Sequence, residues 1–529
     1  MQIKVLQFPI TNRYKPTLPP VFGVITHIWQ VRQAPKVLGF VTISTVRKSG
    51  FLRSVQSISI KHPPQTPRTA TRRKEPAKPM DAFSIQGGNR LSGTITVDGS
   101  KNASLPLLAA TLLTDEAVVF EGVPNLSDIA NMVRLLEELG CTATRVNSQI
   151  QIQSLDSSIS HARYDIVRTM RASVCVLGPL LAKRGEVRVS MPGGCSFGDR
   201  PIDLHLRGLE ALGAKIHLEG GDIVARCERL HGATIFLGGP FGSTVLGTAN
   251  VMSAATLAKG KTIIESAACE PEITDLAKLL NAMGAKISGA GTPRITIEGV
   301  DQLGGASHTV MPDRIVAGTW AIAAAMTNGN VTIEKFPLDH LLAVTDVLST
   351  VGVHVHQTDT SQDPVSCTVQ VTSDRNLKPV MFTTQPFPGF PTDLQAQMMA
   401  LLCLSKGNSI ITEKIYPERF MHVPELSRMG ARLVKQGSTV VVQGVDRLIG
   451  APVMASDLRA SASLIIAGLA AEGETIVSRV YHLDRGYEQM EKTLTALGAK
   501  IKRIDDTQVV DGLPIVDTVP AKKLVQSNS

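Results

Sequence analysis

The sequence predicts an α/β protein of two lobes, each made of three repeats of about 70 residues, with buried helices and outer sheets. A helix ending in Leu-x-x-(Leu/Met/Val)-Gly occurs six times at intervals of 68 to 78 residues. Most of these glycines are followed by Ala and a short apolar stretch that is typical of a strand. Ala-rich helical stretches such as 320–326 and 460–471 are apolar nearly all round, which is typical of buried helices.

The repeats begin at Asp81, and each one is predicted to hold two helices and several strands. The terminal glycines are expected to be left-handed helix C-caps, each followed by a turn into a strand. They are Gly140, Gly213, Gly284, Gly352, Gly430 and Gly498. A second marker, a glycine that ends an Ala/Leu-rich helix and opens a strand, occurs at Gly260, Gly329, Gly407 and Gly473. Leu-x-x-Leu-Gly is also a generic helix end, but six regular occurrences argue against coincidence.

Composition excludes several classes of function. At 529 residues the chain is longer than one core normally serves, and only 4% of its residues are aromatic, which argues against base-stacking platforms. The net charge of +8 is concentrated in residues 1–80, which hold 14 Lys/Arg and a single acidic residue, Glu75. The remaining chain therefore carries a net charge of −5, which argues against a general nucleic-acid surface.

Residues 1–80 have the composition of an organelle transit peptide followed by a disordered, Pro-rich linker. A plastid is favoured over a mitochondrion because the segment is rich in Pro, Ser and Thr and shows no amphipathic Arg helix. The alternative is a disordered extension without a targeting signal, in which case the protein is expected in the cytoplasm. No run of 18 apolar residues occurs, so no membrane insertion is expected.

The seven cysteines are scattered, odd in number and free of any Cys-x-x-Cys pair. This pattern argues against disulfides and a structural zinc site, and it favours a reducing compartment. No His/Cys/Asp cluster has the spacing of metal ligands, and no dinucleotide fingerprint follows a strand. Neither a metal nor a cofactor is therefore expected.

One loop combines the features of a chemical site. In Met191-Pro-Gly-Gly-Cys-Ser-Phe-Gly-Asp-Arg200, three glycines give the backbone freedom around Cys195, and Arg200 supplies a fixed cation. Pro201 is expected to open a helix that has Asp203 in its first turn. A mobile thiol beside a cation can reach over a bound anion and exchange a proton with it. The alternative is an ordinary turn whose cysteine packs in the core.

Further motifs are Asp98-Gly-Ser-Lys-Asn-Ala103, Thr169-Met-Arg-Ala-Ser173, Pro391-Thr-Asp-Leu-Gln-Ala-Gln397, Arg419-Phe-Met-His-Val-Pro-Glu-Leu426, Asp457-Leu-Arg-Ala-Ser461 and His482-Leu-Asp-Arg-Gly-Tyr-Glu488. With the cysteine loop, they make residues 82–503 resemble the enolpyruvyl transferases, and among these the UDP-N-acetylglucosamine 1-carboxyvinyltransferases of peptidoglycan precursor synthesis. The resemblance implies an inside-out α/β barrel fold. Its boundaries would be residues 81–101 plus 312–517 for lobe I, 102–311 for lobe II and 518–529 for a tail. The two crossings between the lobes would form a hinge.

The resemblance also implies a reaction, in which the enolpyruvyl group of phosphoenolpyruvate passes to the 3-hydroxyl of UDP-N-acetylglucosamine and phosphate leaves. Cys195 is implied as the acid and the site of a covalent adduct and of fosfomycin alkylation, and Asp393 as the base. Asp393 could equally be a helix N-cap. Asp457 is expected to hold Arg459 in place. Six cations that a polyanionic substrate would need lie in these motifs: Lys101, Arg171, Arg200, Arg419, Arg459 and Arg485.

Among these cations, the resemblance places Lys101, Arg200 and Arg485 on phosphoenolpyruvate with help from Asn102, and Lys101 and Arg485 are expected to take part in catalysis. Arg419 and Arg459 are expected at the same anion. The residues implied for UDP-N-acetylglucosamine are Arg171, Arg200, Pro201, Ile202, Asp203, Leu204, Ser243, Thr244, Val245, Asp393 and Ile415. His205 is given no proton role, and a monomer is expected.

One segment departs from the resemblance. Some members carry Lys-x-Ser-Val-Gly-Ala-Thr before an Ala-rich helix, whereas this chain reads Gly242-Ser-Thr-Val-Leu-Gly-Thr248 and has no lysine there. An altered affinity for the uridine or the diphosphate follows as an expectation. Two alternatives stay open, an EPSP synthase that uses shikimate 3-phosphate and a catalytically inactive paralogue that acts as a binding protein.

Overall fold

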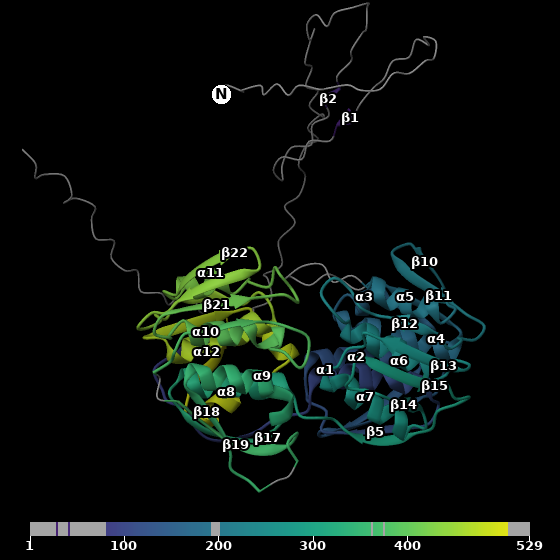
Figure 1. Ribbon diagram of the computed structural model, residues 1–529, viewed down its shortest axis with the longest axis horizontal. Helices are drawn as coiled ribbons and strands as arrows, with labels where there is room; N and C mark the ends of the chain where they lie inside the picture. Colours follow the sequence, from purple (N-terminus) through teal and green to yellow (C-terminus); the bar gives the residue numbers. More distant parts are fainter. Residues whose placement is uncertain are drawn as a thin grey trace, which may run out of the picture. The chain divides into compact units, whose positions relative to one another are not determined.

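A computed structural model of the chain describes residues 81–191, 202–360, 363–373 and 376–505, and the backbone of 28–29 and 41–42. The chain divides into two units, Met1–Ala77 and Lys78–Ser529. In the first unit, β1 (Ile28–Trp29) pairs antiparallel with β2 (Val41–Thr42). The predicted transit segment otherwise lies outside the described residues. All further elements belong to the second unit (Figure 1).

In its described residues the second unit has six four-stranded sheets that share one topology. In each sheet an edge strand pairs parallel with its neighbour, and the two remaining pairings are antiparallel. Three sheets, in spatial order, are β8 (His161–Ala162), β9 (Glu186–Ser190), β11 (Asp222–Arg226), β10 (Lys215–Glu219); β12 (Thr234–Phe236), β13 (Lys261–Glu265), β15 (Arg294–Glu298), β14 (Lys286–Ser288); and β16 (Ala306–Thr309), β5 (Val118–Glu121), β7 (Gln149–Ser154), β6 (Cys141–Val146). The other three are β4 (Ser92–Thr96), β17 (Asn330–Phe336), β19 (Cys367–Ser373), β18 (Val353–Gln357); β20 (Met381–Thr383), β21 (Asn408–Thr412), β23 (Thr439–Gln443), β22 (Arg432–Gln436); and β24 (Pro452–Met454), β25 (Glu474–Ser478), β3 (Asp81–Gln86), β26 (Lys500–Asp505).

Each repeat supplies one buried helix and a second helix with an exposed face. The buried helices are α1 (Lys101–Ala110), α4 (Leu177–Arg184), α6 (Val245–Ala255), α8 (Arg314–Met326), α10 (Gln395–Leu402) and α12 (Leu458–Ala470). The second helices are α2 (Ser127–Glu138), α5 (Asp203–Ala211), α7 (Pro271–Ala282), α9 (Leu342–Val351), α11 (Val423–Arg428) and α13 (Met490–Ala496). The short elements are α3 (Tyr164–Val167) and the 3₁₀ turns η1 (Thr111–Leu113), η2 (Arg171–Val176), η3 (Leu338–Leu341), η4 (Thr392–Leu394) and η5 (Val480–Arg485). Every residue of α8 is buried, which confirms the prediction from its apolar circumference.

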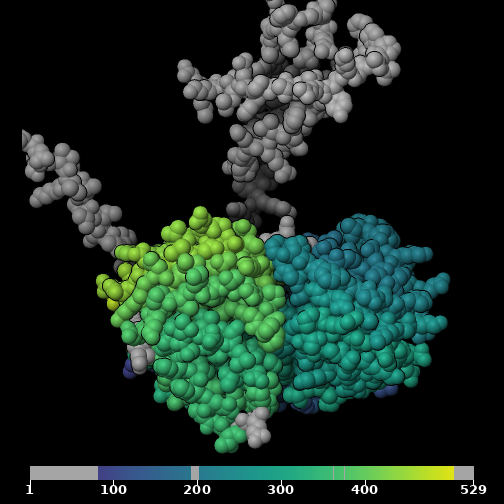
Figure 2. All heavy atoms as spheres, in the orientation of Figure 1, coloured from purple at the N-terminus to yellow at the C-terminus, as the bar shows by residue number. Residues whose placement is uncertain are grey.

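The described residues of the second unit form two hydrophobic cores. Half I, defined by its core, takes residues 83–97 and 315–501, and half II takes residues 103–310. The atoms of the two halves meet along one seam (Figure 2). The chain crosses the seam twice between these ranges, and the two crossings run side by side. The Ser100 N–H donates to the Met311 carbonyl (2.7 Å), and the Asp313 N–H donates to the Asp98 carbonyl (2.9 Å).

The glycines that end the second helices have the conformation predicted from the sequence. Gly140, Gly213, Gly284, Gly352, Gly430 and Gly498 have φ angles of 89°, 99°, 104°, 100°, 89° and 95°. A residue with a side chain rarely adopts these angles, so glycine ends the helix and turns the chain into the next strand.

At Gly299 a close approach of the backbone, and not a positive φ angle, requires glycine. A Cβ at this position would overlap the backbone carbonyl oxygen of Ala258, whereas a Cβ at Gly260 (φ 96°) would meet nothing within 4 Å. We expect Gly299→Ala to lower the free energy of unfolding by about 3 kcal/mol, because the backbone must move. Gly260→Ala, the control, should cost about 1 kcal/mol from conformational strain alone. Urea titration of both variants measures the difference, and equal losses would contradict the steric account.

Candidate active site

Asp393 lies in η4, where it is bound by two arginines. Its Oδ1 accepts a hydrogen bond from Arg419 Nη1 (2.7 Å), and its Oδ2 accepts one from Arg459 Nη2 (2.9 Å). The side chain of Asp393 is 24% exposed, whereas those of Arg419 and Arg459 are only 6% and 3% exposed. Both carboxylate oxygens therefore bind guanidinium groups. The N-cap residues of η4 and α10 are Pro391 and Leu394, and neither helix has a side-chain cap, so the alternative role of Asp393 as a helix cap is wrong.

The charges around Asp393 decide its protonation state. Burial by itself raises the pKa of this carboxyl, but the guanidinium groups of Arg459 and Arg419 outweigh burial and hold the pKa well below its ordinary value. Asp393 is therefore ionised at neutral pH. A carboxylate so strongly stabilised is a weak base until a substrate changes its surroundings, for instance by bringing its own negative charge to the arginines.

Local structure positions the two arginines. Arg459 is the second residue of α12, and the Asp457 side chain caps this helix by accepting the N–H of Arg459 (2.9 Å) and of Ala460 (3.1 Å). Asp457 thus holds Arg459 through its backbone, as an N-cap does. Arg419 Nη1 also donates to Thr392 Oγ1 (3.0 Å), beside Asp393 in η4.

The turn before Arg419 is organised by Glu413, a fully buried carboxylate. Glu413 accepts hydrogen bonds from the hydroxyls of Thr384 (2.7 Å) and Thr392 (2.9 Å) and from the N–H groups of Ile415 (2.8 Å) and Tyr416 (2.9 Å). It therefore ties the 384–392 loop, which leads to Asp393, to the segment that carries Ile415.

A second cation pair spans the seam. Asp128, in the first turn of α2 in half II, accepts hydrogen bonds from Arg485 of half I (Nε to Oδ1, 3.0 Å; Nη2 to Oδ2, 3.5 Å). The same carboxylate lies 3.6 Å from Lys101 Nζ. Burial lowers the pKa of Lys101, and Asp128 opposes that effect. One buried carboxylate of half II therefore fixes Arg485 of half I and Lys101, which lies at a crossing between the halves.

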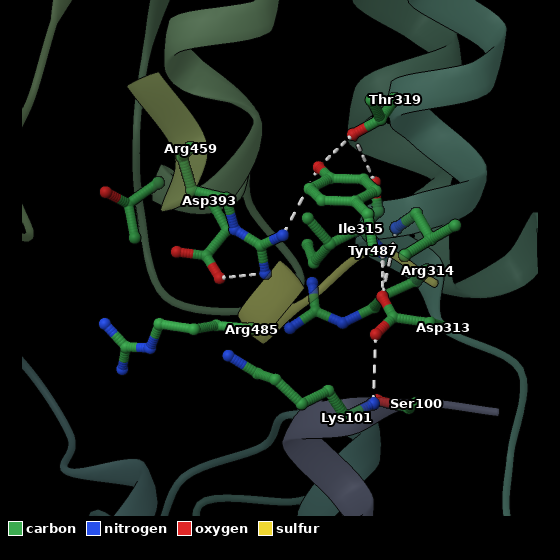
Figure 3. A network of polar contacts seen from close by, with 12 residues as sticks. Ser100, Lys101, Asp313, Arg314, Ile315, Thr319, Asp393, Arg459, Arg485 and Tyr487 are labelled. Carbon is green, nitrogen blue, oxygen red and sulfur yellow. Dashed lines mark hydrogen bonds and ion pairs between the residues drawn. The ribbon is translucent and has the colours of Figure 1, made fainter. Parts of the chain in front are cut away.

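These groups converge on one region. In Figure 3 the side chains of Lys101, Asp393, Arg459 and Arg485 come from separate elements and gather around a common space. Lys101 is close enough to Asp393, Arg459 and Arg485 for each to influence its pKa. Lys101 and Arg459 also occupy the first turns of α1 and α12, so the partial positive charges of two helix N-termini add to the side-chain cations. The region is suited to a compact polyanion.

Asp313 joins the two crossings beside this region. Its Oδ1 caps α8 by accepting the N–H of Ile315 (2.8 Å) and of Val316 (3.0 Å). Its Oδ2 accepts the N–H of Lys101 (3.1 Å), the first residue of α1. The start of α1, and with it Lys101, is thereby fixed relative to α8.

The residues predicted for the nucleotide sugar lie on adjoining segments. α5 begins at Asp203, and Leu204 packs so closely on the 239–242 turn that a Cβ at Gly239 would lie 3.1 Å from Leu204 Cδ1. A Cβ at Gly242 would lie 3.0 Å from Pro386 in the loop that leads to Asp393. Thr244 caps α6 by accepting the N–H of Gly247 (3.2 Å), and Ser243 and Val245 flank it. The 239–242 turn therefore lies between Leu204 and the loop that leads to Asp393, and the 243–245 segment follows directly after it.

The remaining predicted residues lie either outside the described residues or on neighbouring elements. Cys195, Arg200 and Pro201 fall among residues 192–201, which the structure does not describe. Asn102 follows Lys101 in α1. Arg171 begins η2 and lies near His205, a buried histidine whose Nδ1 is 2.9 Å from Asn250 Nδ2. Burial and Arg171 lower the pKa of His205 to about 3, which agrees with its having no proton role.

The described cysteines are poor candidates for acid or nucleophile. At Cys141, Cys175, Cys227, Cys269, Cys367 and Cys403, burial raises the pKa of the thiol. A reactive cysteine needs the opposite shift. Among the seven cysteines, Cys195 thus remains the candidate.

Sequence reasoning missed four residues of the site. Asp128 gave no signal beyond its place at a helix start, and Thr319 looked like one more residue of an apolar helix. Gln397 and Tyr487 lie within motifs that were singled out, but nothing in the sequence assigned them a role. Three of their hydrogen bonds join residues far apart in the sequence: Gln397 to Thr319 (78 positions), Gln397 to Tyr487 (90 positions) and Arg485 to Asp128 (357 positions).

Comparison with known proteins identifies the family. Residues 85–494 match the family model of EPSP synthase (3-phosphoshikimate 1-carboxyvinyltransferase). The chain is 53% identical over 428 residues to UDP-N-acetylglucosamine 1-carboxyvinyltransferase of Gluconacetobacter diazotrophicus, covering 80% of this chain and 100% of the relative. It is 51% identical over 427 residues to the enzyme of the same name from Methylacidiphilum infernorum, covering 80% and 99%.

Solved structures show the same fold. The crystal structure of the enolpyruvyl transferase NikO from Streptomyces tendae matches with a TM-score of 0.72 at 24% identity, covering 81% of this chain and 99% of that one. EPSP synthase from Acinetobacter baumannii matches with a TM-score of 0.62 at 17% identity, covering 80% and 100%. The six equivalent sheets, the buried helices and these matches together show that the chain has the enolpyruvyl transferase fold and belongs to the UDP-N-acetylglucosamine 1-carboxyvinyltransferases within the EPSP synthase family.

Proposed function

We propose that this chain transfers the enolpyruvyl group of phosphoenolpyruvate to the 3-hydroxyl of UDP-N-acetylglucosamine and releases phosphate, the first committed step of peptidoglycan precursor synthesis. The observation that carries the proposal is a group of cations shared by two carboxylates at the seam. Arg459 and Lys101 act on Asp393, and Lys101 and Arg485 lie on Asp128. Phosphoenolpyruvate brings a phosphate and a carboxylate, which such a set of cations can bind together. Lys101 and Arg485 would bind this substrate with Arg200 and Asn102, and Arg419 and Arg459 would complete the anion site.

In this proposal Asp393 accepts the proton of the sugar 3-hydroxyl. Its carboxylate is ionised, and substrate anions that engage Arg419 and Arg459 would weaken their hold on it, which raises its basicity during binding. The acceptor would lie along the Ile202–Leu204 and Ser243–Val245 segments and near Ile415 and Arg171. Cys195 would supply the proton to the methylene carbon.

The acceptor substrate that the chain uses distinguishes the proposed function from the EPSP synthase reaction and from an inactive paralogue. The test is phosphate release by a chain that begins near Met80, with phosphoenolpyruvate and either UDP-N-acetylglucosamine or shikimate 3-phosphate. Turnover only with the nucleotide sugar supports the proposal, and turnover only with shikimate 3-phosphate selects the EPSP synthase reaction. Absence of turnover with both, in protein that still binds UDP-N-acetylglucosamine, selects the inactive paralogue.

Substitutions at Cys195 test the proposed acid. We expect Cys195→Ala to lose nearly all turnover at neutral pH and all alkylation by fosfomycin, because the proton donor and the nucleophile are the same thiol. Cys195→Asp should keep turnover and resist fosfomycin, because a carboxyl group can donate a proton but alkylates poorly. Mass spectrometry after incubation with the drug, beside the phosphate assay, measures both. Full activity of Cys195→Ala would show that the acid is another group.

The two cores suggest how the site closes. We propose that they are lobes I and II and that the paired crossings at 98–101 and 311–314 act as the hinge between them. Each half supplies part of the site, so closure assembles Lys101 and Asp128 with Arg485 and Asp393.

Residues 1–80 are proposed to direct the protein to a plastid. Their basic, nearly acid-free composition supports this, and the bacterial relatives match only about four-fifths of the chain while covering nearly all of their own length. Among the described residues no helix is long and apolar enough to cross a membrane. A fluorescent reporter fused behind residues 1–80 should enter plastids, and a reporter that stays in the cytosol would contradict the proposal.

A further inference from the structure

The hydroxyl of Tyr487 lies where three buried helices meet. Its oxygen is 2.8 Å from Thr319 Oγ1 on α8, 3.3 Å from Gln397 Nε2 on α10 and 3.3 Å from Arg459 Nη1 on α12. The residue is 2% exposed, and its ring packs edge-on against Trp320. Figure 3 shows the phenol between Thr319 and the Arg459 guanidinium.

The direction of these hydrogen bonds can be worked out from proton counts. The Thr319 hydroxyl donates its single proton to the Ile315 carbonyl (2.7 Å), one turn earlier in α8. Its oxygen can therefore only accept from its other neighbours, so the Tyr487 hydroxyl must donate to Thr319. The Tyr487 oxygen is then left with acceptor capacity alone, which it presents to Arg459 and Gln397.

This arrangement holds Arg459 at two ends by groups of different charge. One nitrogen donates to the Asp393 carboxylate and the other to the neutral phenol, while the guanidinium carbon lies 5.6 Å from the centre of the Tyr487 ring. A neutral acceptor and an aromatic face fix a guanidinium without cancelling its charge. A second carboxylate in place of the phenol would hold Arg459 as firmly but would neutralise the cation.

Gln397 connects the same hydrogen-bond network to Asp393, the carboxylate partner of Arg459. Its Nε2 donates to the Asp393 backbone carbonyl (3.0 Å) and to Thr319 Oγ1 (3.2 Å), besides its contact with the Tyr487 oxygen. Both members of the Asp393–Arg459 pair are therefore anchored to one set of neutral groups.

We propose that Tyr487 is a positioning residue of the transfer reaction, which fixes the Arg459 guanidinium and through it the orientation of the Asp393 carboxylate toward the acceptor hydroxyl. The inference rests on the proposed function, because Asp393 is the base only in that reaction. Tyr487 touches no substrate in this scheme. Its effect lies on the chemical step rather than on substrate binding.

The first variant is Tyr487→Phe, which keeps the ring and removes the hydroxyl. Arg459 loses its neutral anchor and becomes free to turn, so kcat should fall by about 10- to 100-fold, while both KM values change by less than about threefold. A less constrained Arg459 also depresses the Asp393 pKa less, so the acid limb of the kcat profile should move to higher pH. The matched control is Tyr481→Phe, which removes the hydroxyl of an exposed tyrosine in η5, the turn just before Tyr487, and should match the wild type.

Thr319→Val is the second variant and covers the case in which Tyr487→Phe folds poorly. It removes the acceptor that orients the phenol proton and should give a smaller loss of kcat in the same direction. An unchanged kcat and pH profile in a folded Tyr487→Phe protein, with only a lower Tm, would overturn the positioning role.

The two proposals can fail separately. A wild-type chain that does not turn over UDP-N-acetylglucosamine refutes the proposed function and leaves the geometric claim testable. A crystal structure of Tyr487→Phe then decides it: an Arg459 guanidinium displaced from Asp393 supports the positioning role, and an unchanged contact near 2.9 Å overturns it.

Discussion

Replacing Asp393 by asparagine is expected to reduce kcat by about 100- to 10,000-fold, the range that a positioned general base contributes. The amide keeps the shape of the side chain and removes the group that accepts the proton of the acceptor hydroxyl. Binding of UDP-N-acetylglucosamine, measured by calorimetry, should survive in part, because other segments contact the nucleotide. A kcat within about threefold of the wild type would show that another group is the base.

The same substitution has a consequence for stability, with a sign that can be checked. Asparagine leaves Arg419 and Arg459 buried without their counter-charge, at a cost of about 3–5 kcal/mol near neutral pH. Because the folded-state pKa of Asp393 is depressed, its stabilisation is fully present above the unfolded value of about 3.9 and is lost as the pH falls through the folded pKa. The difference in Tm between wild type and variant should therefore be constant from pH 8 to about 4 and should narrow below that.

Replacing Asp128 by asparagine is the second substitution with a large expected effect. Lys101 and Arg485 lose the carboxylate that holds both of them, so kcat/KM for phosphoenolpyruvate should fall by about 10- to 100-fold. Burial lowers the pKa of Lys101 and Asp128 raises it, so without Asp128 the pKa falls further and Lys101 loses its proton at lower pH. The basic limb of the kcat/KM profile should accordingly move to lower pH.

A second carboxylate at the seam serves as the control for this substitution. Glu272 of α7 forms a buried, doubly hydrogen-bonded pair with Arg314 of α8 (3.0 and 3.3 Å) and also joins the two halves. Glu272→Gln should lower the free energy of unfolding and leave the basic limb of the kcat/KM profile at the same pH as in the wild type. If Asp128→Asn and Glu272→Gln shift the limb equally, the effect comes from a loosened seam and not from Lys101.

The repeat architecture could be predicted because its determinants are local. A glycine at the end of each second helix and an all-apolar buried helix recur within every repeat, so the pattern can be seen in any one of them. What stays hidden is which strand completes which sheet. β3, at the start of the second unit, pairs with β25 and β26 near its end, and β16 pairs with β5 almost 200 residues away. No short stretch of sequence specifies such pairings.

The residues of the site also fall into those that the sequence could identify and those that it could not. Lys101, Arg419, Arg459, Arg485 and Asp393 could be named from their motifs, and the structure brings all five together. The two roles that the sequence left open for Asp393, base or helix cap, could not be separated without knowing where its carboxylate lies. Asp128 and Tyr487 escaped because their importance arises only from contacts across the seam and between helices. Cys195 and Arg200 lie outside the described residues and remain predictions.

We expect the two halves of the second unit to share one anion site. The most direct test is a crystal structure of the full chain with UDP-N-acetylglucosamine and inorganic phosphate. The phosphate is expected within about 3 Å of both Lys101 Nζ and the Arg485 guanidinium, with the sugar 3-hydroxyl facing Asp393. A phosphate bound by side chains of one half alone, with Asp393 turned away from the sugar, would show that the two halves do not share one anion site.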